Sequence, residues 1–207
     1  MSTILAFEQL TTLVAGPYQR ELAGAQIAVL QGPSGCGKSL LLRALADLDQ
    51  HGGKIFCQGQ EHQALSAPQW RRLVAYMPAE SAWWNDCIGS HILPHPQRRE
   101  WLQSLQLPEE SLTWSVARCS SGERQRLALL AALCRNPRVL LLDEPTASCD
   151  PTTTASLEEL LQRWVQEEER GILMISHDPE QAARIADCIW RMDAKGSLID
   201  PDNYDSL

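Results

Sequence analysis

The octapeptide Gly32-Pro-Ser-Gly-Cys-Gly-Lys-Ser39 (GPSGCGKS) decides the fold expected of this chain. The apolar run at residues 27–30 (IAVL) before it predicts a β-strand, and residues 39–48 (SLLLRALADL) after it predict a helix. The glycines let the backbone wrap with its N–H groups pointing inward, and the following helix directs the positive end of its dipole at the same point. Strand, loop and helix together predict a phosphate-binding loop.

Two side chains give this loop its expected chemistry. Lys38 would reach the β- and γ-phosphates of a nucleotide, and the Ser39 hydroxyl would ligate Mg²⁺, so ATP and Mg²⁺ are the expected ligands. A chance glycine-rich turn is the alternative, which the flanking strand and helix disfavour. The expected nucleotide contacts in the loop are Gly32, Pro33, Ser34, Gly35, Cys36, Gly37, Lys38, Ser39 and Leu40.

A pair of acids follows a second apolar run about a hundred residues later. Asp143 and Glu144 come directly after residues 139–142 (VLLL). An aspartate at the tip of a buried strand can hold Mg²⁺ through its hydration shell, opposite Ser39. Glu144 is then placed to orient or deprotonate an attacking water. Seen alone, such a pair would be interpreted as two solvated acids at a strand end, and the phosphate loop upstream favours the metal and catalytic roles.

Short apolar runs alternate with helical stretches along most of the chain. Runs that are apolar on both faces are typical of strands buried in a parallel sheet, and they occur at residues 27–30, 139–142, 172–175 (ILMI) and 188–192 (CIWRM). Between them, residues 156–169 predict a helix with leucines on one stripe and Glu or Gln opposite. This alternation favours an α/β domain with a mostly parallel sheet.

Two regions depart from that pattern. Residues 1–26 and 54–60 predict a small β-rich flank, with turns at residues 16–17 (GP) and 52–53 (GG). Residues 83–136 contain no convincing strand and predict a helical insertion carried by the sheet domain. No internal repeat is visible, so residues 1–207 are interpreted as a single domain.

Composition and charge argue against several classes of protein. The net charge of -8 disfavours non-specific binding of nucleic acid, which usually requires an excess of Lys and Arg. The seven cysteines include no CxxC pair, as expected of reduced thiols in the cytoplasm. No apolar run approaches the length of a membrane-spanning helix, and no signal peptide is recognised. Residues 167–170 (EEER) are interpreted as a solvated helix end.

Three further segments complete an ordered set of motifs. Residues 119–126 (CSSGERQR) resemble the signature segment of the ATP-binding cassette (ABC) family, residues 147–150 (ASCD) its D-loop, and residues 176–178 (SHD) its switch-histidine motif. The resemblance covers nearly the whole chain. It implies a P-loop NTPase cassette with a mostly parallel sheet core, a small N-terminal antiparallel β flank and a helical subdomain carrying the signature. It also implies ATP hydrolysis, in which His177 would contact the γ-phosphate and fix the water with Glu144.

The signature explains why such cassettes work in pairs. Ser120 and Gly122 are expected where a helix begins, exposing unpaired N–H groups and a positive dipole end. The resemblance implies a head-to-tail dimer, with itself or with a second cassette, in which each signature caps the γ-phosphate held by the other chain. The signature contacts expected with this nucleotide are Ser120, Ser121, Gly122 and Glu123.

Some positions depart from the family pattern. Ser121 replaces the first glycine of the signature. Ala79 occupies the position of a Mg²⁺-contacting Gln, and Glu80 either replaces it as a metal ligand or is a solvated loop acid. No clear aromatic residue stands where the family stacks adenine, although Phe7 and Tyr18 flank that position.

A cassette of this kind usually acts on a separate permease, and this would place it peripherally at the inner face of the cell membrane. Trp83 and Trp84 fall where a permease helix docks in such transporters, and core packing is the alternative. A soluble non-transport ATPase or a regulatory cassette of low activity remains the alternative function. The chain is weakly similar to cassettes of metal or iron exporters.

Overall fold

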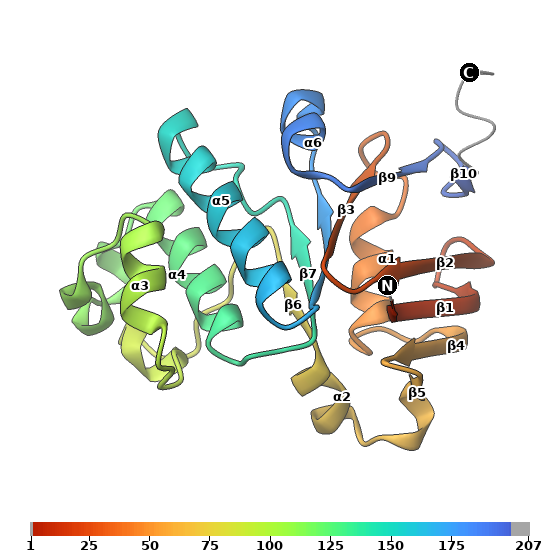
Figure 1. The fold of residues 1–207 in the computed structure, drawn as a ribbon, viewed down its shortest axis with the longest axis horizontal. Coiled ribbons are helices and arrows are strands. Elements are labelled where there is room, and N and C mark those ends of the chain that lie inside the picture. Colours follow the sequence, from red (N-terminus) through yellow and green to blue (C-terminus); the bar gives the residue numbers. More distant parts are fainter. Residues whose placement is uncertain (1, 200–207) are drawn as a thin grey trace.

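The computed structural model describes residues 2–199, which form two sheets with helices between and beside them (Figure 1). The larger sheet has the strand order β10-β9-β3-β8-β7-β6, and its described neighbours are parallel except for the β9–β10 pair. The predicted, mostly parallel sheet is confirmed. Its strands are β3 (Gln26–Gln31), β6 (Val74–Met77), β7 (Val139–Asp143), β8 (Gly171–Ile175), β9 (Cys188–Met192) and β10 (Leu198–Ile199).

The expected β-rich flank is an antiparallel sheet of order β2-β1-β4-β5. The prediction of a turn at residues 52–53 is wrong, because β4 already begins at Gly52. Gly53 has φ +81°, and a Cβ there would collide with the backbone of Gln9 on the neighbouring strand. The two glycines therefore permit a close, irregular strand pairing. The strands are β1 (Thr3–Thr11), β2 (Tyr18–Ala23), β4 (Gly52–Cys57) and β5 (Gln60–Glu61).

The helices separate into layers around the larger sheet. In Figure 1, α1 lies between the two sheets, α5 covers the opposite face, and α3 and α4 lie beyond α5. The helices are α1 (Lys38–Leu45), α2 (Ala67–Leu73), α3 (Arg98–Ser104), α4 (Ser121–Leu133), α5 (Pro151–Glu167) and α6 (Pro179–Ile185), and the 3₁₀ turns are η1 (His62–Ala64), η2 (Ile88–His91), η3 (Glu109–Thr113) and η4 (Val116–Arg118).

Helix α5 begins five residues before the expected position. Asp150 caps it by accepting a hydrogen bond from the Thr153 amide at 3.0 Å, and Pro151 supplies a φ already suited to the first turn. Residues 83–136, for which a helical insertion is predicted, contain α3, α4 and the turns η2 to η4.

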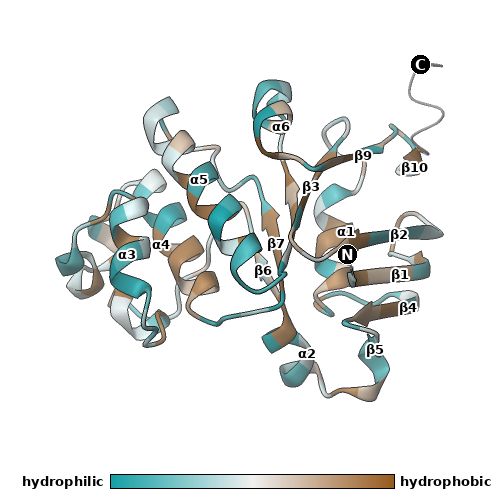
Figure 2. Ribbon diagram, viewed as in Figure 1, coloured by the Kyte–Doolittle hydropathy of each residue, from teal (hydrophilic) through white to brown (hydrophobic). Residues whose placement is uncertain are grey.

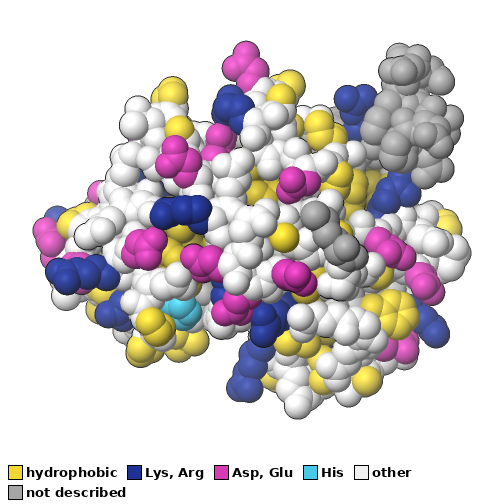
Figure 3. Space-filling view, viewed as in Figure 1, with side chains coloured by type: hydrophobic (Ala, Val, Ile, Leu, Met, Phe, Trp, Pro, Cys, Tyr) yellow, Lys and Arg dark blue, Asp and Glu magenta, His cyan; other side chains and the backbone are white. Residues whose placement is uncertain are grey.

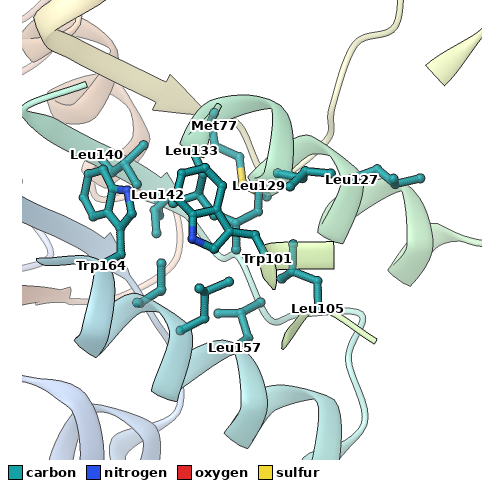
Figure 4. Packing of buried hydrophobic residues seen from close by; sticks show 14 of the residues in the cluster. Met77, Trp101, Leu105, Leu127, Leu129, Leu133, Leu140, Leu142, Leu157 and Trp164 are labelled. Carbon is teal, nitrogen blue, oxygen red and sulfur yellow. The ribbon is translucent and has the colours of Figure 1, made fainter. Parts of the chain in front are cut away.

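Alternation along the buried strands creates two cores. In β3, Ile27 and Val29 face the layer of α3, α4 and α5, whereas Ala28 and Leu30 face α1 and the antiparallel sheet. Figure 2 shows β7 as a brown, hydrophobic strand, whereas α5 and α6 carry teal, hydrophilic residues. In Figure 4, Trp101 and Trp164 extend among the leucines of the first core. Burial on both faces explains why residues 27–30 of β3 are all apolar.

Candidate functional site

The glycine-rich loop connects β3 to α1, and Gly37 is the N-cap of that helix. Gly37 has φ +105° and Gly35 φ +78°, in the left-handed region that glycine adopts without steric penalty. A Cβ at Gly35 would meet nothing within 4 Å, so backbone conformation alone requires glycine there. A Cβ at Gly32 would collide with the Met192 carbonyl oxygen. Glycines therefore hold the loop around the start of α1, where a helix attracts anions.

Lys38 is almost fully buried beneath this loop. Its Nζ donates hydrogen bonds of 2.8 Å to the carbonyl oxygens of Gly32 and of Pro33, and lies 4.0 Å from Cys36 Sγ. The positive charge is thus anchored beside the N-terminus of α1. The cavity outside the loop is lined by Ser34, Gly35, Gly37, Lys38, Ser39, Leu40, Glu144, Ile175 and His177.

The acid and the histidine expected to act together are in contact. His177 Nε2 lies 3.1 Å from Glu144 Oε1, and both side chains line the same cavity as Ser39. Glu144 follows β7 with φ +51°, and its amide donates a 3.2 Å hydrogen bond to the Ile175 carbonyl at the end of β8. Because β7 and β8 are parallel neighbours, their carboxyl ends bring the two side chains to one edge of the sheet.

Asp143 terminates β7 and is buried. Tyr76, which the sequence analysis missed, donates a 3.1 Å hydrogen bond from its hydroxyl to Asp143 Oδ2. Burial raises the pKa of Tyr76 and the adjacent Asp143 raises it further, so the phenol stays protonated as a donor. Asp143 itself is not among the residues that line the phosphate-loop cavity.

The signature segment forms the start of α4, as expected. Ser120 is the N-cap, and its Oγ accepts a hydrogen bond from the Glu123 amide at 3.2 Å. In return, the Ser120 amide donates to Glu123 Oε2 at 2.8 Å. This capping box corrects the expectation that the Ser120 amide is unpaired. A Cβ at Gly122 would lie 2.6 Å from the Ser148 carbonyl oxygen, so glycine allows the signature to touch the segment after β7.

Gln125 is a site residue that the sequence analysis missed. This buried side chain donates from Nε2 to the Glu144 carbonyl oxygen and accepts from the Ser148 amide at 3.3 Å. It therefore ties α4 to the backbone that carries the expected catalytic acid. In the sequence, the one signal for Gln125 was its place in the Gln-Arg pair of the signature segment.

Glu80 does not join the phosphate-loop cavity. It lines a separate cavity with Ala79, Ser121 and Arg124. The structure therefore does not bring Glu80 together with Ser39 in the way expected of a shared metal site.

The aromatic residues considered for the nucleotide base are both unsuitable. Phe7 and Tyr18 are fully buried in the core between the two sheets. Leu13 and Val14, between β1 and β2, are instead 67% and 66% exposed. A Cβ at Gly37 would lie 3.8 Å from Val14 Cγ2, so this apolar loop borders the phosphate loop.

The tandem tryptophans have different environments. Trp83 is partly buried and packs against the first core, whereas Trp84 is 75% exposed. The buried His91 ring contacts both, at centroid distances of 4.9 and 4.1 Å. Core packing thus fits Trp83, and an exposed docking residue fits Trp84. A groove beside them is lined also by Met77 at the end of β6, by Pro78 after it, and by Ala128, Ala131 and Arg135 of the α4 region.

Solved structures show the same fold. The chain superposes with a TM-score of 0.83 on a bacterial Atm1-family ABC exporter with ATP bound, at 23% identity, covering 96% of this chain and 38% of that one. An ATP binding subunit of an ABC transporter also gives a TM-score of 0.83, at 21% identity, covering 95% of this chain and 88% of that one.

Sequence comparison identifies the family. A probable iron export ATP-binding protein, FetA of Escherichia coli, is 30% identical over 77% of this chain and 76% of its own length. The aliphatic sulfonates import ATP-binding protein SsuB 2 of Pseudomonas fluorescens is 36% identical over 80% of this chain, but only 62% of that longer protein is covered. The family model for ABC transporters matches residues 18–147, and the chain therefore belongs to the ABC transporter family as an ATP-binding cassette.

Proposed function

We propose that this cassette hydrolyses ATP with Glu144 and His177 at the reacting end of the nucleotide. The observation that supports this most directly is the 3.1 Å contact of His177 Nε2 with Glu144 Oε1 at the cavity lined by the phosphate loop. Glu144 orients or deprotonates the attacking water through its second carboxylate oxygen. His177 holds the Glu144 side chain and contacts the γ-phosphate.

The phosphate loop provides a matching site for the triphosphate. Lys38 and the N-terminus of α1 supply positive charge, and the open space at Gly35 admits phosphate oxygens close to the backbone. Ser39 and Asp143 would hold Mg²⁺, because a hydroxyl and a carboxylate are the hard oxygen ligands that it prefers. When bound, Mg²⁺ neutralises charge that develops on the phosphates. Glu80 is omitted from this metal site because it lines another cavity.

The exposed loop at Leu13 and Val14 supplies the surface for the base. It is apolar, it borders Gly37, and the nearby aromatic rings of Phe7 and Tyr18 are buried. An aliphatic contact of this kind offers no pattern of hydrogen bonds that distinguishes adenine from guanine. The cassette would accordingly select its nucleotide weakly by base.

Turnover requires two cassettes in head-to-tail arrangement. The start of α4 favours an anion, but α1 of the same chain already serves its own phosphate loop. Ser120, Ser121, Gly122 and Glu123 would therefore face the nucleotide of a second copy or of a related cassette. The chain acts as one domain in this scheme, with residues 83–136 as the helical subdomain that presents the signature.

A separate permease is the proposed partner of the dimer. None of the helices within residues 2–199 is both long and apolar enough to cross a bilayer. The groove beside the exposed Trp84 offers an aromatic anchor of the kind enriched at interfaces. Nucleic acid is a poor alternative partner, because the net charge is -8 and acidic and basic side chains are interspersed on the face in Figure 3. The relatives' names include both iron export and sulfonate import, so we assign the choice of cargo to the permease.

The Glu144→Gln variant tests the scheme. It should bind ATP without hydrolysing it and should shift from monomer to dimer with ATP but not with ADP, as measured by size exclusion with light scattering. The matched control adds Lys38→Ala, which should abolish both ATP binding and the shift. Wild-type turnover by Glu144→Gln would refute the catalytic role. Tight ATP binding without any dimer would refute self-association and leave a second cassette subunit as the partner.

A further inference from the structure

Three metal-ligating side chains meet on the side of the molecule where α1 ends. Asp47 follows α1, His51 immediately precedes β4, and His62 opens the 3₁₀ turn η1 before α2 (Figure 1). Their ligand atoms all lie within 4.8 Å of one another. None of the three residues contributes to the cavity of the phosphate loop, so the proposed ATPase chemistry gives no reason for their convergence.

The distances suit a shared ion better than direct hydrogen bonds. Asp47 Oδ1 lies 3.8 Å from His51 Nε2 and 3.6 Å from His62 Nε2. Both separations are too long for hydrogen bonds. A zinc ion with bonds of about 2.0–2.2 Å at tetrahedral angles holds neighbouring ligand atoms about 3.4 Å apart. The three ligand atoms lie within 4.8 Å of one another, so rotation of the imidazoles toward a shared centre would complete this geometry.

The surrounding side chains hold the two rings in place. The imidazoles of His51 and His62 lie 4.8 Å apart between centroids, and the His62 ring packs edge-on against Trp70 at 5.7 Å. Trp70 is fully buried and donates a 2.9 Å hydrogen bond from Nε1 to the Leu45 carbonyl at the end of α1. The side chains of His51 and His62 are only 6% and 15% exposed. Little ordering is therefore left for a ligand to impose.

A second contact orients the carboxylate. Arg71 Nη1 donates to the Asp47 carbonyl oxygen at 2.9 Å and lies 3.6 Å from Asp47 Oδ2. This contact leaves Oδ1 directed at the two histidines. Outer partners commonly orient metal-ligating carboxylates in this way. His62 Nδ1 is buried and has no hydrogen-bond partner among the described residues. The imidazole thus has unused polar capacity inside the protein.

We propose that Asp47, His51 and His62 bind one divalent transition-metal ion of the zinc class, with water completing its coordination. Two imidazole nitrogens and one carboxylate oxygen match the ligand preference of Zn²⁺, Co²⁺ or Ni²⁺. Mg²⁺ prefers an all-oxygen octahedral shell, so the metal that accompanies ATP is not the occupant. The bound ion would join the end of α1 to β4 and to the turn before α2, and so would stabilise the fold independently of nucleotide.

The test uses the full chain in a Cys87→Ser background, since Cys87 is the exposed thiol among the described cysteines. Co²⁺ and Zn²⁺ are titrated separately by calorimetry without nucleotide, and the Co²⁺ absorption spectrum distinguishes imidazole from thiolate ligands. We expect one ion per chain, paramagnetic shifts confined to the imidazoles of His51 and His62, and a rise in Tm with Zn²⁺.

Matched variants make the result decisive. His51→Gln combined with His62→Gln should abolish stoichiometric binding and the rise in Tm, and Asp47→Asn should weaken binding at least tenfold. His95→Gln, which alters an imidazole stacked on Trp101 elsewhere, should change neither. Failure of the chain to bind either metal, equal binding by the double variant, or a thiolate spectrum would overturn the proposal. If the double variant fails to fold, Asp47→Asn supplies the same test.

Discussion

Replacing Gln125 by Met tests whether α4 positions the acid at the end of β7. Methionine keeps the length of the side chain but removes both hydrogen bonds, to the Glu144 carbonyl and from the Ser148 amide. The Glu144 carbonyl keeps a 3.3 Å hydrogen bond from the Ala147 amide, and Ser148 is exposed to water. Neither backbone group is left without a partner, so the loss is that of two ordinary hydrogen bonds, about 1–3 kcal/mol in total.

For this variant we expect a larger effect on turnover than on stability. For a chain of this size, this loss of unfolding free energy corresponds to a fall in Tm of roughly 2–12 °C. Release of the Glu144 backbone should lower kcat about 10- to 100-fold, because small displacements of a catalytic group are expensive, while KM for ATP changes little.

Urea unfolding followed by tryptophan fluorescence and steady-state phosphate release supply the two measurements. Gln103→Met, at an exposed position on α3, is the control and should alter stability by less than about 0.5 kcal/mol. If Gln125→Met matched wild type in both stability and kcat, the contact would have no positioning role.

Three other predictions follow from the site. Val14→Asp should raise the Kd for ATP about tenfold without destabilising the fold, as measured by nucleotide titration, because it removes an exposed apolar contact for the base; unchanged affinity would exclude the base contact. Trp84→Ala should change the unfolding free energy by less than about 0.5 kcal/mol yet reduce co-purification with the proposed permease. Trp83→Ala should instead destabilise the fold by about 1–3 kcal/mol. Full retention of the permease by folded Trp84→Ala would exclude the docking role. Hydrogen bonds from Ser120 hold the pKa of Glu123 below its usual 4.5, so the stability they confer is present above about pH 4.5 and is lost as pH falls through the lowered value. Urea unfolding as a function of pH should therefore show a shallower acid limb for Glu123→Gln, and an identical limb would exclude this linkage.

The buried strands were predictable because their signal is local. All four apolar runs proposed from the sequence are strands, and residues 27–30, 139–142 and 172–175 are buried and apolar at every position, as strands enclosed on both faces must be. Strand β6 (VAYM) was missed because four residues with a phenol among them carry little pattern. Its place beside β7 comes from tertiary pairing.

Two buried charges show where sequence patterns are insufficient. Arg170, expected at a solvated helix end, is 1% exposed, lies 4.6 Å from the centre of the Trp164 ring and pairs with Glu168 at 3.2 Å. Glu158, expected on the polar side of its helix, is buried and hydrogen bonded by Gln181 and Arg184. These acids and bases find partners through packing, so the pattern of polar and apolar residues gives the wrong exposure.

Part of the candidate site could likewise be predicted from the sequence, and part could not. The loop at residues 32–39 and the approach of Glu144 to His177 follow from motifs at the ends of parallel strands. The contacts of Gln125 with Glu144 and of Gly122 with Ser148 join residues that are far apart in the sequence, and no local pattern encodes them.

The length of α4 has a mechanical consequence. Its thirteen residues span about 20 Å. The helix starts at the signature, holds the backbone of Glu144 through Gln125 in its second turn, and lines the groove beside Trp84 with Ala128 and Ala131. A helix moves nearly as a stiff rod over this distance, so a push applied in the groove would displace the start of α4 and the backbone of Glu144 together.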